Sequence, residues 1–554
     1  MLERFTRTEF ASYEDFYEHF EVNVPEDFNF GFDVIDAWAQ EQPDKPALLW
    51  CDDHDHEQRF SFGDLSHLSS QAAHYLQSLG VQKGDTVLLL MRRRYEYWFL
   101  MLALHKLGAV AIPATHILTT KDIVYRIQAA DIRAVITLDD AEVMAHVDEA
   151  MADCPDCKHL ITVGPAHGRW QSLHEEMQRF PTAFTRPTGD DATLARDPML
   201  IYFTSGTTGM PKMVLHNFTY PLGHIVTARF WQKLHEHSLH ITVADSGWAK
   251  CSWGKMYGQW IVGACVFVYD MDRFQPTHLL EKLEKYRVTS FCAPPTIYRF
   301  MIREHMESYD LSSLERCTTA GEPLNPEVFN KVKQMLGLEI AEGFGQSETT
   351  PIMASFQWLE VHPGSMGKPS PGYDVELVNE HGEVCDVGEE GEIIVFTRKQ
   401  RPVGLFAGYY NDLEKTKAAW HYGAYHTGDV AWKDEEGYYW FVGRADDVIK
   451  SSGYRIGPFE VESALMEHDA VVECAISAVP DPVRGQIVKA TIVLAKGYEP
   501  CEALVKALQD HVKHVTAPYK YPRQIEFVEE LPKTFSGKIR RAELREQDRQ
   551  KHQS

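Results

Sequence analysis

The chain alternates between two patterns of apolar residues. Residues 62–79 carry apolar side chains at the three- and four-residue spacing of an amphipathic helix, whereas 86–91 and 199–203 are short, nearly unbroken apolar runs. Runs of that length bounded by turn residues predict strands buried on both faces. Similar strand candidates lie at 135–137, 264–268 and 290–292. Helix-like segments separate these runs, and the alternation predicts parallel βαβ units of an α/β fold.

The pattern changes near residue 374, where short strand-like segments and glycine-containing turns begin. Residues 391–397 predict a strand, and Glu435-Glu436-Gly437 predicts the turn of a hairpin. The last hundred residues predict a compact α+β unit, whose first helix spans 458–467 and begins with proline, a residue favoured at that position. Its other predicted elements are strands at 471–479, 486–494 and 524–528 and a helix at 501–514.

Length and charge narrow the class of protein. A chain of 554 residues exceeds what one hydrophobic core usually holds, so we expect at least two domains. The formal net charge of -25 disfavours nucleic acid and anionic membranes as partners, because both attract positive surfaces. The apolar segment 97–111 reads as a helix, but His105 and Lys106 interrupt it and it is too short to span a bilayer.

Cysteine and histidine residues give no sign of a disulfide scaffold or a metal site. The ten cysteines are scattered, and the Cys154/Cys157 pair has no second pair at zinc spacing. His235, His237 and His240 lack a nearby carboxylate or cysteine at a ligand spacing. The first thirty residues are too acidic for a transit peptide, so we expect a cytoplasmic enzyme.

A loop rich in glycine and hydroxyl groups follows the strand predicted at 199–203. Its glycines let backbone N–H groups approach a phosphate closely, while hydroxyls and one lysine add donors and charge. The predicted phosphate-binding residues are Thr204, Ser205, Gly206, Thr207, Thr208, Gly209, Met210, Pro211 and Lys212. The loop is no Walker A motif, because its lysine follows Met-Pro. Alone, such a loop is often only a loop.

A second segment supports the phosphate interpretation. Near the C-terminus the chain reads Leu-Pro-Lys-Thr-Phe-Ser-Gly-Lys over 531–538, and with the first loop it resembles the adenylate-forming superfamily. This superfamily comprises acyl-CoA synthetases, luciferases and the adenylation domains of peptide synthetases. Further matching segments lie between them in the same order, at 321–323, 342–348, 425–429, 443–447 and 453–457. Among these relatives the chain is most similar to medium-chain acyl-CoA synthetases.

The resemblance implies a two-domain architecture. Residues 1–445 would form a large domain of two βα-layered subdomains plus a small β-barrel. Residues 446–554 would form a small, mobile α+β domain that carries the catalytic lysine Lys538, with Asp446 as the hinge. Periodicity alone does not locate this boundary.

Adenylation joins two anions, so its chief requirements are charge neutralisation and alignment rather than proton transfer. The resemblance assigns this chemistry to Lys538, Ser347 and Glu348, with Glu348 as a ligand of Mg²⁺, a hard cation suited to carboxylates. Asp429 would accept the ribose hydroxyls opposite Arg444. The remaining ATP-binding residues would be Gly321, Glu322, Pro323, Glu342, Gly343, Phe344, Gly345 and Gln346.

The second half-reaction would transfer the acyl group to CoA after the small domain rotates about Asp446. Cationic side chains suit the phosphates of CoA. The matching positions are Ser452, Gly453, Tyr454, Arg455, Arg484, Lys513, Tyr521 and Arg523. The neighbouring Arg540 and Arg541 we interpret as a solvated basic face.

The acyl pocket is predicted from one small residue. Acetyl-activating relatives carry a tryptophan where this chain has Gly345, so glycine should admit an acid of four to eight carbons, each methylene contributing about 0.8 kcal/mol. By resemblance Trp248, Cys251, Ser252 and Lys255 line the pocket from one helical face. Lys255 has two interpretations: a packed stem with a solvated head, or a group that tunes which acids are accepted.

The sequence therefore predicts an ATP-dependent acyl-CoA synthetase. It would convert a medium-chain, branched or aryl carboxylic acid, ATP and CoA to acyl-CoA, AMP and pyrophosphate through an acyl-adenylate. Two alternatives remain: transfer to the thiol of a carrier protein, and a non-catalytic regulator that binds an acyl-adenylate. The segment ending at Lys538 also resembles an acetylation target, so a lysine acetyltransferase and deacetylase are expected partners, because acetylation removes the charge.

Overall fold

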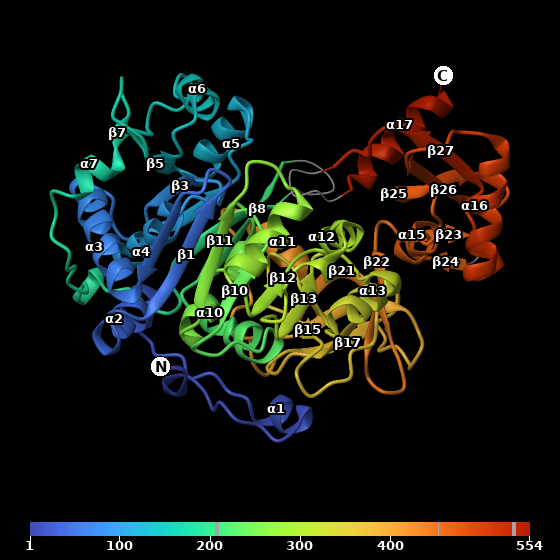
Figure 1. Ribbon diagram of the computed structural model, residues 1–554, viewed down its shortest axis with the longest axis horizontal. Coiled ribbons are helices and arrows are strands. Elements are labelled where there is room, and N and C mark those ends of the chain that lie inside the picture. The colour runs from blue at the N-terminus through green and yellow to red at the C-terminus, as the bar shows by residue number, and fades with distance from the viewer. Residues whose placement is uncertain (205–209, 453, 534–538, 554) are drawn as a thin grey trace.

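The computed structural model describes residues 1–204, 210–452, 454–533 and 539–553. The described residues form three β-sheets flanked by helices, and the C-terminal sheet stands to one side of the other two (Figure 1). The α/β class predicted from the sequence is confirmed, with a large N-terminal part and a small C-terminal part.

The first sheet, as the described part of the chain forms it, has eight strands in the order β19-β9-β8-β4-β3-β5-β6-β7, and neighbouring strands run parallel from β8 to β7. Its strands are β3 (Thr86–Leu90), β4 (Val110–Ala114), β5 (Ile132–Thr137), β6 (His159–Thr162), β7 (Gln171–Ser172), β8 (Pro198–Thr204), β9 (Lys212–Asn217) and β19 (Gly408–Tyr409). Helices α3 (Phe62–Ser78), α4 (Glu96–Leu107), α5 (Thr120–Ala130) and α6 (Ala141–Ala150) connect them. The predicted βαβ alternation is thus confirmed.

The helix predicted over 97–111 is wrong at its C-terminal end. Helix α4 ends at Leu107, and Gly108 follows in the left-handed conformation with φ of 71°. A glycine there closes a helix because it lacks the Cβ that would clash. Residues 110–114 then form β4. The apolar pattern continued across the boundary because helix and strand are both fully buried.

The second sheet contains fourteen strands within the residues described, and the large cleft of the protein opens at its parallel half. Its order is β17-β18-β21-β22-β16-β15-β14-β13-β12-β10-β11-β1-β2, with β20 paired to β21. The strands are β1 (Pro46–Asp52), β2 (Glu57–Ser61), β10 (Leu239–Thr242), β11 (Cys265–Asp270), β12 (Ser290–Cys292), β13 (Arg316–Ala320), β14 (Ile340–Phe344), β15 (Met353–Ala354), β16 (Ser365–Pro369), β17 (Asp374–Val378), β18 (Gly391–Phe396), β20 (Trp420–His421), β21 (Ala424–Lys433) and β22 (Tyr439–Arg444). Helices α9 (Ala249–Gly254), α10 (Tyr257–Val262), α11 (Pro276–Lys285), α12 (Pro295–Met301) and α13 (Pro326–Leu336) accompany it.

The antiparallel end of this sheet is where the resemblance implied a small β-barrel. Strands β17, β18, β21, β22 and β16 pair in series and join the parallel strands through β15. The pairs formed by the described residues leave β17 at an open edge, so the barrel is not confirmed. The hairpin turn at Glu435–Gly437 is confirmed between β21 and β22, with Gly437 at φ of 84°.

The C-terminal unit has its own sheet and core. Its elements are β23 (Ile449–Ser451), β24 (Tyr454–Ile456), β25 (Val471–Asp481), β26 (Gly485–Leu494), β27 (Gln524–Val528), α15 (Pro458–Met466), α16 (Glu502–Val515) and α17 (Arg541–Gln553). Ile456, Leu465, Ile476, Ile492 and Leu508 form part of a separate buried cluster. The domain boundary at Asp446 stays a prediction, and it lies in the connection between β22 and β23.

The cysteine and histidine residues singled out in the sequence have the following surroundings in the described ranges. All ten cysteines are free, and Cys154 and Cys157 are buried thiols. His240 lies in the core, where its ring nitrogens contact the hydroxyls of Ser290 and Thr242 at 2.9 Å. Within the described ranges no cluster of three or more His, Cys, Asp or Glu could hold a metal ion. None of the helices described is long and apolar enough to cross a membrane.

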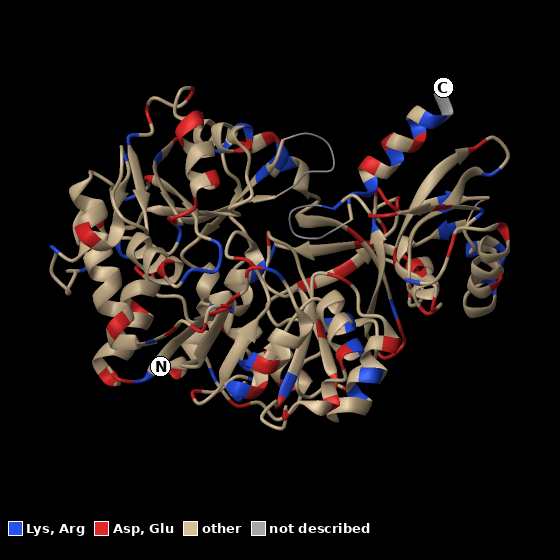
Figure 2. Cartoon of the chain, turned by 45° about the horizontal axis from the view of Figure 1, so that its top comes forward, with Lys and Arg blue, Asp and Glu red and all other residues tan. Residues whose placement is uncertain are grey.

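The basic residues at the start of α17 differ in environment. The helix carries interspersed acidic and basic side chains (Figure 2). Arg540 is exposed and pairs with Glu543 at 2.8 Å. Arg541 instead donates two hydrogen bonds, at 2.6 and 2.8 Å, to Glu462 of α15, whose side chain is 8% exposed. The interpretation as a solvated face is therefore wrong for Arg541, because a buried carboxylate requires a partner.

We expect Arg541→Ala to destabilise the C-terminal unit by about 3 kcal/mol, because it leaves Glu462 buried and unpaired. Arg540→Ala, the matched control, should change stability by less than about 0.5 kcal/mol. Hydrogen exchange of the amides of β25 and β26 measures the difference. Equal protection in the two variants would contradict the expectation.

Candidate active site

A cleft of about 1490 Å³ lies at the carboxyl ends of the parallel strands β10, β13 and β14 and extends to the C-terminal unit. Ligands of open α/β sheets bind at this edge, because loops and helix N-termini converge there. Segments far apart in the sequence line it, from Arg93 to Arg545. The cleft is therefore the candidate active site.

The predicted phosphate loop begins and ends at this cleft. Thr204 closes β8 and Lys212 opens β9, and the two residues pair across the antiparallel ladder and line the cleft. The ammonium of Lys212 lies 5.2 Å from the centre of the Tyr409 ring. Met210 is exposed and the Pro211 carbonyl accepts from Tyr125 at 3.0 Å, and neither residue lines the cleft. Ser205, Gly206, Thr207, Thr208 and Gly209 lie outside the described residues.

The segment from Glu342 to Glu348 forms the floor of the cleft, and all its residues line it. Burial raises the pKa of Glu342 to about 8, although the N–H of Leu324 donates to its carboxylate at 3.3 Å. Glu348 accepts a hydrogen bond of 3.0 Å from the hydroxyl of Tyr409. The Ser347 carbonyl contacts Nε2 of the buried His216 at 2.7 Å. These contacts fix the backbone just before Glu348, whose carboxylate oxygens are of the kind that bind Mg²⁺.

Asp429 is held by residues of two other predicted motifs, 342–348 and 443–447. Nε2 of Gln346 donates to its carboxylate and, at 2.8 Å, to the carbonyl of Thr427. The Tyr425 hydroxyl donates to Oε1 of Gln346 at 2.6 Å, which sets the orientation of the amide. Arg444 lies 3.3 Å from the other oxygen of Asp429. A carboxylate fixed in this way can accept hydrogen bonds from a vicinal diol.

The residues predicted to contact adenine also line the cleft. Gly321 adopts φ of 99°, which favours glycine, and Glu322 accepts from the Thr296 hydroxyl at 2.9 Å. Pro323 and Phe344 complete this wall, with the Phe344 ring 6.1 Å from that of Phe441. Lys538 lies outside the described residues, but its neighbours Lys533 and Ile539 line the same cleft.

The predicted CoA-binding residues lie apart from the cleft, and none of those described lines it. Lys513 and Arg523 meet at Tyr521: the ammonium lies 4.4 Å from the ring centre, and the guanidinium donates to the hydroxyl at 2.6 Å. Arg484 donates to the Ser452 hydroxyl at 3.1 Å. Gly453 lies outside the described residues.

Arg455, also predicted to bind CoA, pairs with the large domain in this arrangement. Its guanidinium lies 3.0 Å from Glu380 and 3.6 Å from Glu390. Tyr454 stacks on Tyr519 with ring centres 4.1 Å apart. Near the predicted hinge, Asp446 lies 3.8 Å from Arg444. A positive charge already paired with two carboxylates must be released before it can bind a phosphate.

Gly345 does not open the cleft in the way the sequence predicts. A Cβ at this position would lie 2.5 Å from Cη2 of Trp253 and 2.7 Å from the carbonyl of Thr350. The missing side chain therefore leaves no open space, because the indole of Trp253 occupies it. Trp253 lines the cleft and donates to the Thr349 carbonyl at 3.1 Å. A tryptophan from α9 thus walls this side of the cleft.

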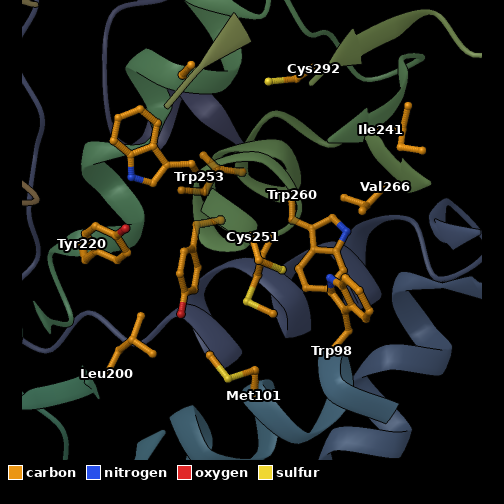
Figure 3. Close-up of a cluster of buried hydrophobic side chains, with 14 of the residues drawn as sticks. Trp98, Met101, Leu200, Tyr220, Ile241, Cys251, Trp253, Trp260, Val266 and Cys292 are labelled. Carbon is orange, nitrogen blue, oxygen red and sulfur yellow. The ribbon is translucent and has the colours of Figure 1, made fainter. Parts of the chain in front are cut away.

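The predicted pocket-lining face of residues 248–255 is only partly correct. Trp248 and Lys255 line the cleft, whereas Cys251 and Ser252 do not. Cys251 belongs to the buried cluster that Figure 3 shows with Trp98 and Met101, and the Ser252 hydroxyl contacts that of Tyr202. Helix α9 ends at Gly254, so Lys255, seven residues after Trp248, is not part of the helical face on which the prediction placed it.

Lys255 does not have the solvated head of the first interpretation. It is 2% exposed, and its ammonium donates to the Ala244 carbonyl at 2.8 Å. Burial lowers the pKa of this amine to about 8. The second interpretation, that Lys255 tunes the choice of acid, stays a prediction. It requires Lys255 to lie at the acyl site, and Lys255 does line the cleft.

Sequence reasoning missed Trp253, Tyr409 and Glu392 as cleft residues. No spacing marks the first two, since their positions depend on packing between distant segments. Glu392 stands in a predicted strand, where a glutamate usually faces solvent.

Comparison with known proteins agrees with this geometry. Residues 35–410 match the family described as AMP-binding enzyme, and 460–538 match the AMP-binding enzyme C-terminal domain. The chain is 43% identical to the mitochondrial acyl-coenzyme A synthetases ACSM3 of Pongo abelii and ACSM5 of Homo sapiens. These alignments cover 98% and 95% of the chain and 93% and 91% of the relatives.

Solved structures give the same result. An anthranilate CoA ligase in complex with anthranoyl-AMP is 28% identical with a TM-score of 0.87, covering 96% of this chain and 99% of that one. A benzoate CoA ligase from Burkholderia xenovorans is 27% identical with a TM-score of 0.81, covering 94% and 100%. The chain therefore belongs to the AMP-binding enzyme family and, within it, to the acyl-coenzyme A synthetases.

Proposed function

We propose that this protein converts a medium-chain, branched or aryl carboxylic acid, ATP and CoA to acyl-CoA, AMP and pyrophosphate through an acyl-adenylate. The observation that carries the proposal is the convergence of Lys212, Glu348, Asp429 and Arg444 on one cleft beside an apolar wall. A nucleotide alone would not require that apolar wall, whereas an acyl group would. The AMP-binding relatives named as CoA ligases support the acyl acceptor.

In the first half-reaction, Asp429 would accept the ribose hydroxyls and Arg444 would face the ribose from the other side. Phe344 and the turn at Gly321–Pro323 would flank adenine. Thr204–Lys212 and Ser347 would contact the phosphates. Glu348 would hold Mg²⁺, which neutralises phosphate charge, and Lys538 would offset the charge that develops between carboxylate and α-phosphate.

In the second half-reaction, the small domain would turn about Asp446 and bring its cationic side chains to CoA. The pairing of Arg455 with Glu380 and Glu390 supports such a step, because this charge is engaged elsewhere in the present arrangement. Lys513 and Arg523, gathered at Tyr521, and Arg484 supply further positive charge. This set favours CoA over the thiol of a carrier protein. Glu348 and Asp429 at one cleft favour turnover over simple binding of an acyl-adenylate.

Two further parts of the proposal rest on the sequence. Acetylation of Lys538 by a lysine acetyltransferase would remove the positive charge that adenylation needs. Exchange of pyrophosphate into ATP at the normal rate by the acetylated protein would disprove this regulation by acetylation. A cytoplasmic location is also proposed, and cell fractionation checks it.

Pyrophosphate release with ATP and Mg²⁺ across acids from acetate to octanoate, with branched and benzoic acids included, tests the function. We expect turnover that requires CoA and is greatest beyond acetate, because the cleft offers an apolar wall to longer chains. Single-turnover release that CoA does not accelerate would indicate a carrier protein as acceptor. Absence of release with every acid would favour the binding-only alternative.

Trp253→Leu should shift preference toward longer acids, since the indole beside Gly345 limits the space in the cleft. Two more methylenes are worth about 1.6 kcal/mol, so the octanoate-to-butyrate ratio of kcat/KM should rise about tenfold. Trp231→Leu is the matched control, because Trp231 packs on Gly343 in the same way but does not line the cleft. An equal octanoate-to-butyrate ratio in the two variants would contradict the role of Trp253 as a wall of the acyl site.

Lys255 predicts a pH effect on acid binding. With its pKa near 8, the amine is mostly charged at about pH 7 and mostly neutral at about pH 9. The cation favours a carboxylate, so KM for the acid should rise over this interval in the wild type and stay flat in Lys255→Met. The exposed Lys285→Met serves as control. Acid preference and kcat/KM unaltered by Lys255→Ala would sink the tuning role.

A further inference from the structure

The backbone that presents Asp429 departs from a regular strand. Glu392 of β18 lies opposite Val430 of β21, and Ile394 lies opposite His426, so residues 427–429 face the single Ile393. Gly428 adopts φ of 71° in this bulge, and its carbonyl accepts from Ala445 at 2.9 Å. Bulges re-aim the side chains that follow them. Here the next residue is Asp429.

One side chain holds the bulge from the neighbouring strand. Oε1 of Glu392 accepts a hydrogen bond of 2.9 Å from the N–H of Gly428, and its Oε2 lies 3.0 Å from Nδ1 of His426. The same turn is fastened by Thr427, whose hydroxyl donates to the Ile393 carbonyl at 2.7 Å and accepts from the N–H of Asp429 at 3.1 Å. Glu392 therefore binds a backbone donor that the strand ladder leaves unpaired.

The surroundings keep Glu392 ionised and in place. Burial alone would raise the pKa of this carboxyl, but the hydrogen bonds from His426 and Gly428 hold it below its ordinary value. The His426 ring is covered by His421, with ring centres 3.4 Å apart and planes at 14°. Glu392, His421 and His426 all line the cleft. Hydrogen bonds to an ionised acceptor are stronger than those between neutral groups.

We infer that Glu392 is a positioning residue for the nucleotide site: it sets the direction of the Asp429 carboxylate and thereby the discrimination between ribose and deoxyribose. The inference rests on the proposed contact of Asp429 with the ribose hydroxyls. Gln346 and Arg444 hold the carboxylate oxygens, whereas Glu392 holds the backbone on which that carboxylate stands. A small change of that backbone moves the acceptor away from both hydroxyls.

The test compares ATP with 2′-deoxy-ATP in acyl-adenylate formation. Glu392→Ala should raise KM for ATP about tenfold, with little change in kcat, as expected for loss of a hydrogen bond to a charged group. KM for 2′-deoxy-ATP should rise less, so the ratio of kcat/KM for the two nucleotides should fall toward one. Glu392→Gln keeps an acceptor for Gly428 and should restore most of the discrimination.

Glu376→Ala is the matched control. This glutamate of β17 has a similar side-chain exposure, 33% against 29% for Glu392, and its ion pair with Lys433 is long at 4.0 Å. It should leave the ratio unchanged. Equal loss with both nucleotides in Glu392→Ala would show a merely structural role and overturn the inference. Asp429→Asn distinguishes failure of the Glu392 role from failure of the proposed ribose contact. An active Asp429→Asn variant with undiminished discrimination between ATP and 2′-deoxy-ATP would overturn the ribose contact itself.

Discussion

The Asp429 carboxylate is the point at which the separate segments of the cleft are joined. It is almost fully buried, and hydrogen bonds connect it to Gln346, after the parallel strand β14, and to Arg444, at the end of β22. A buried charge is tolerated only when it is paired and hydrogen-bonded. These side-chain hydrogen bonds add to the backbone pairing through β16 and β15 that joins the antiparallel strands to the parallel ones. Hydrogen bonds through Asp429 thus connect the floor of the cleft to the wall formed by β21 and β22.

Aromatic side chains determine the shape of the rest of the cleft. Gly343 of β14 and Gly345, directly after that strand, let the indoles of Trp231 and Trp253 pack on the backbone. Tryptophan buries a large area while its N–H needs a partner, and here the carbonyls of Ala341 and Thr349 accept these hydrogen bonds. Another segment of the chain therefore fills the space at both glycines, and only at Gly345 is the filling side chain, Trp253, also a wall of the cleft.

The C-terminal unit is stabilised largely by its own contacts. Arg541 and Glu462 form a buried ion pair within it, and Lys489 is paired with Glu526 at 2.6 Å and with Asp548. Its contacts with the large domain include more exposed ion pairs, such as Arg455 with Glu380. Exposed pairs contribute only about 0–1 kcal/mol each. The strongest of these ion pairs therefore lie inside the C-terminal unit rather than between it and the large domain.

The sequence by itself determined the α/β class, the order of the strands along the chain, and the residues of the cleft floor. Strands 290–292 and 524–528 were predicted with their final bounds, because apolar periodicity is local information. Motif residues such as Glu348 and Asp429 were also predicted to share one site, and both line the cleft. The end of α4 was missed, because burial on all sides removes the contrast between helix and strand. The wall at Trp253, the buried head of Lys255, the ion pair of Arg541 and the support of Asp429 by Glu392 were decided only by the tertiary structure. Each depends on which distant segment fills a space or satisfies a buried charge, and no pattern along one segment contains that information.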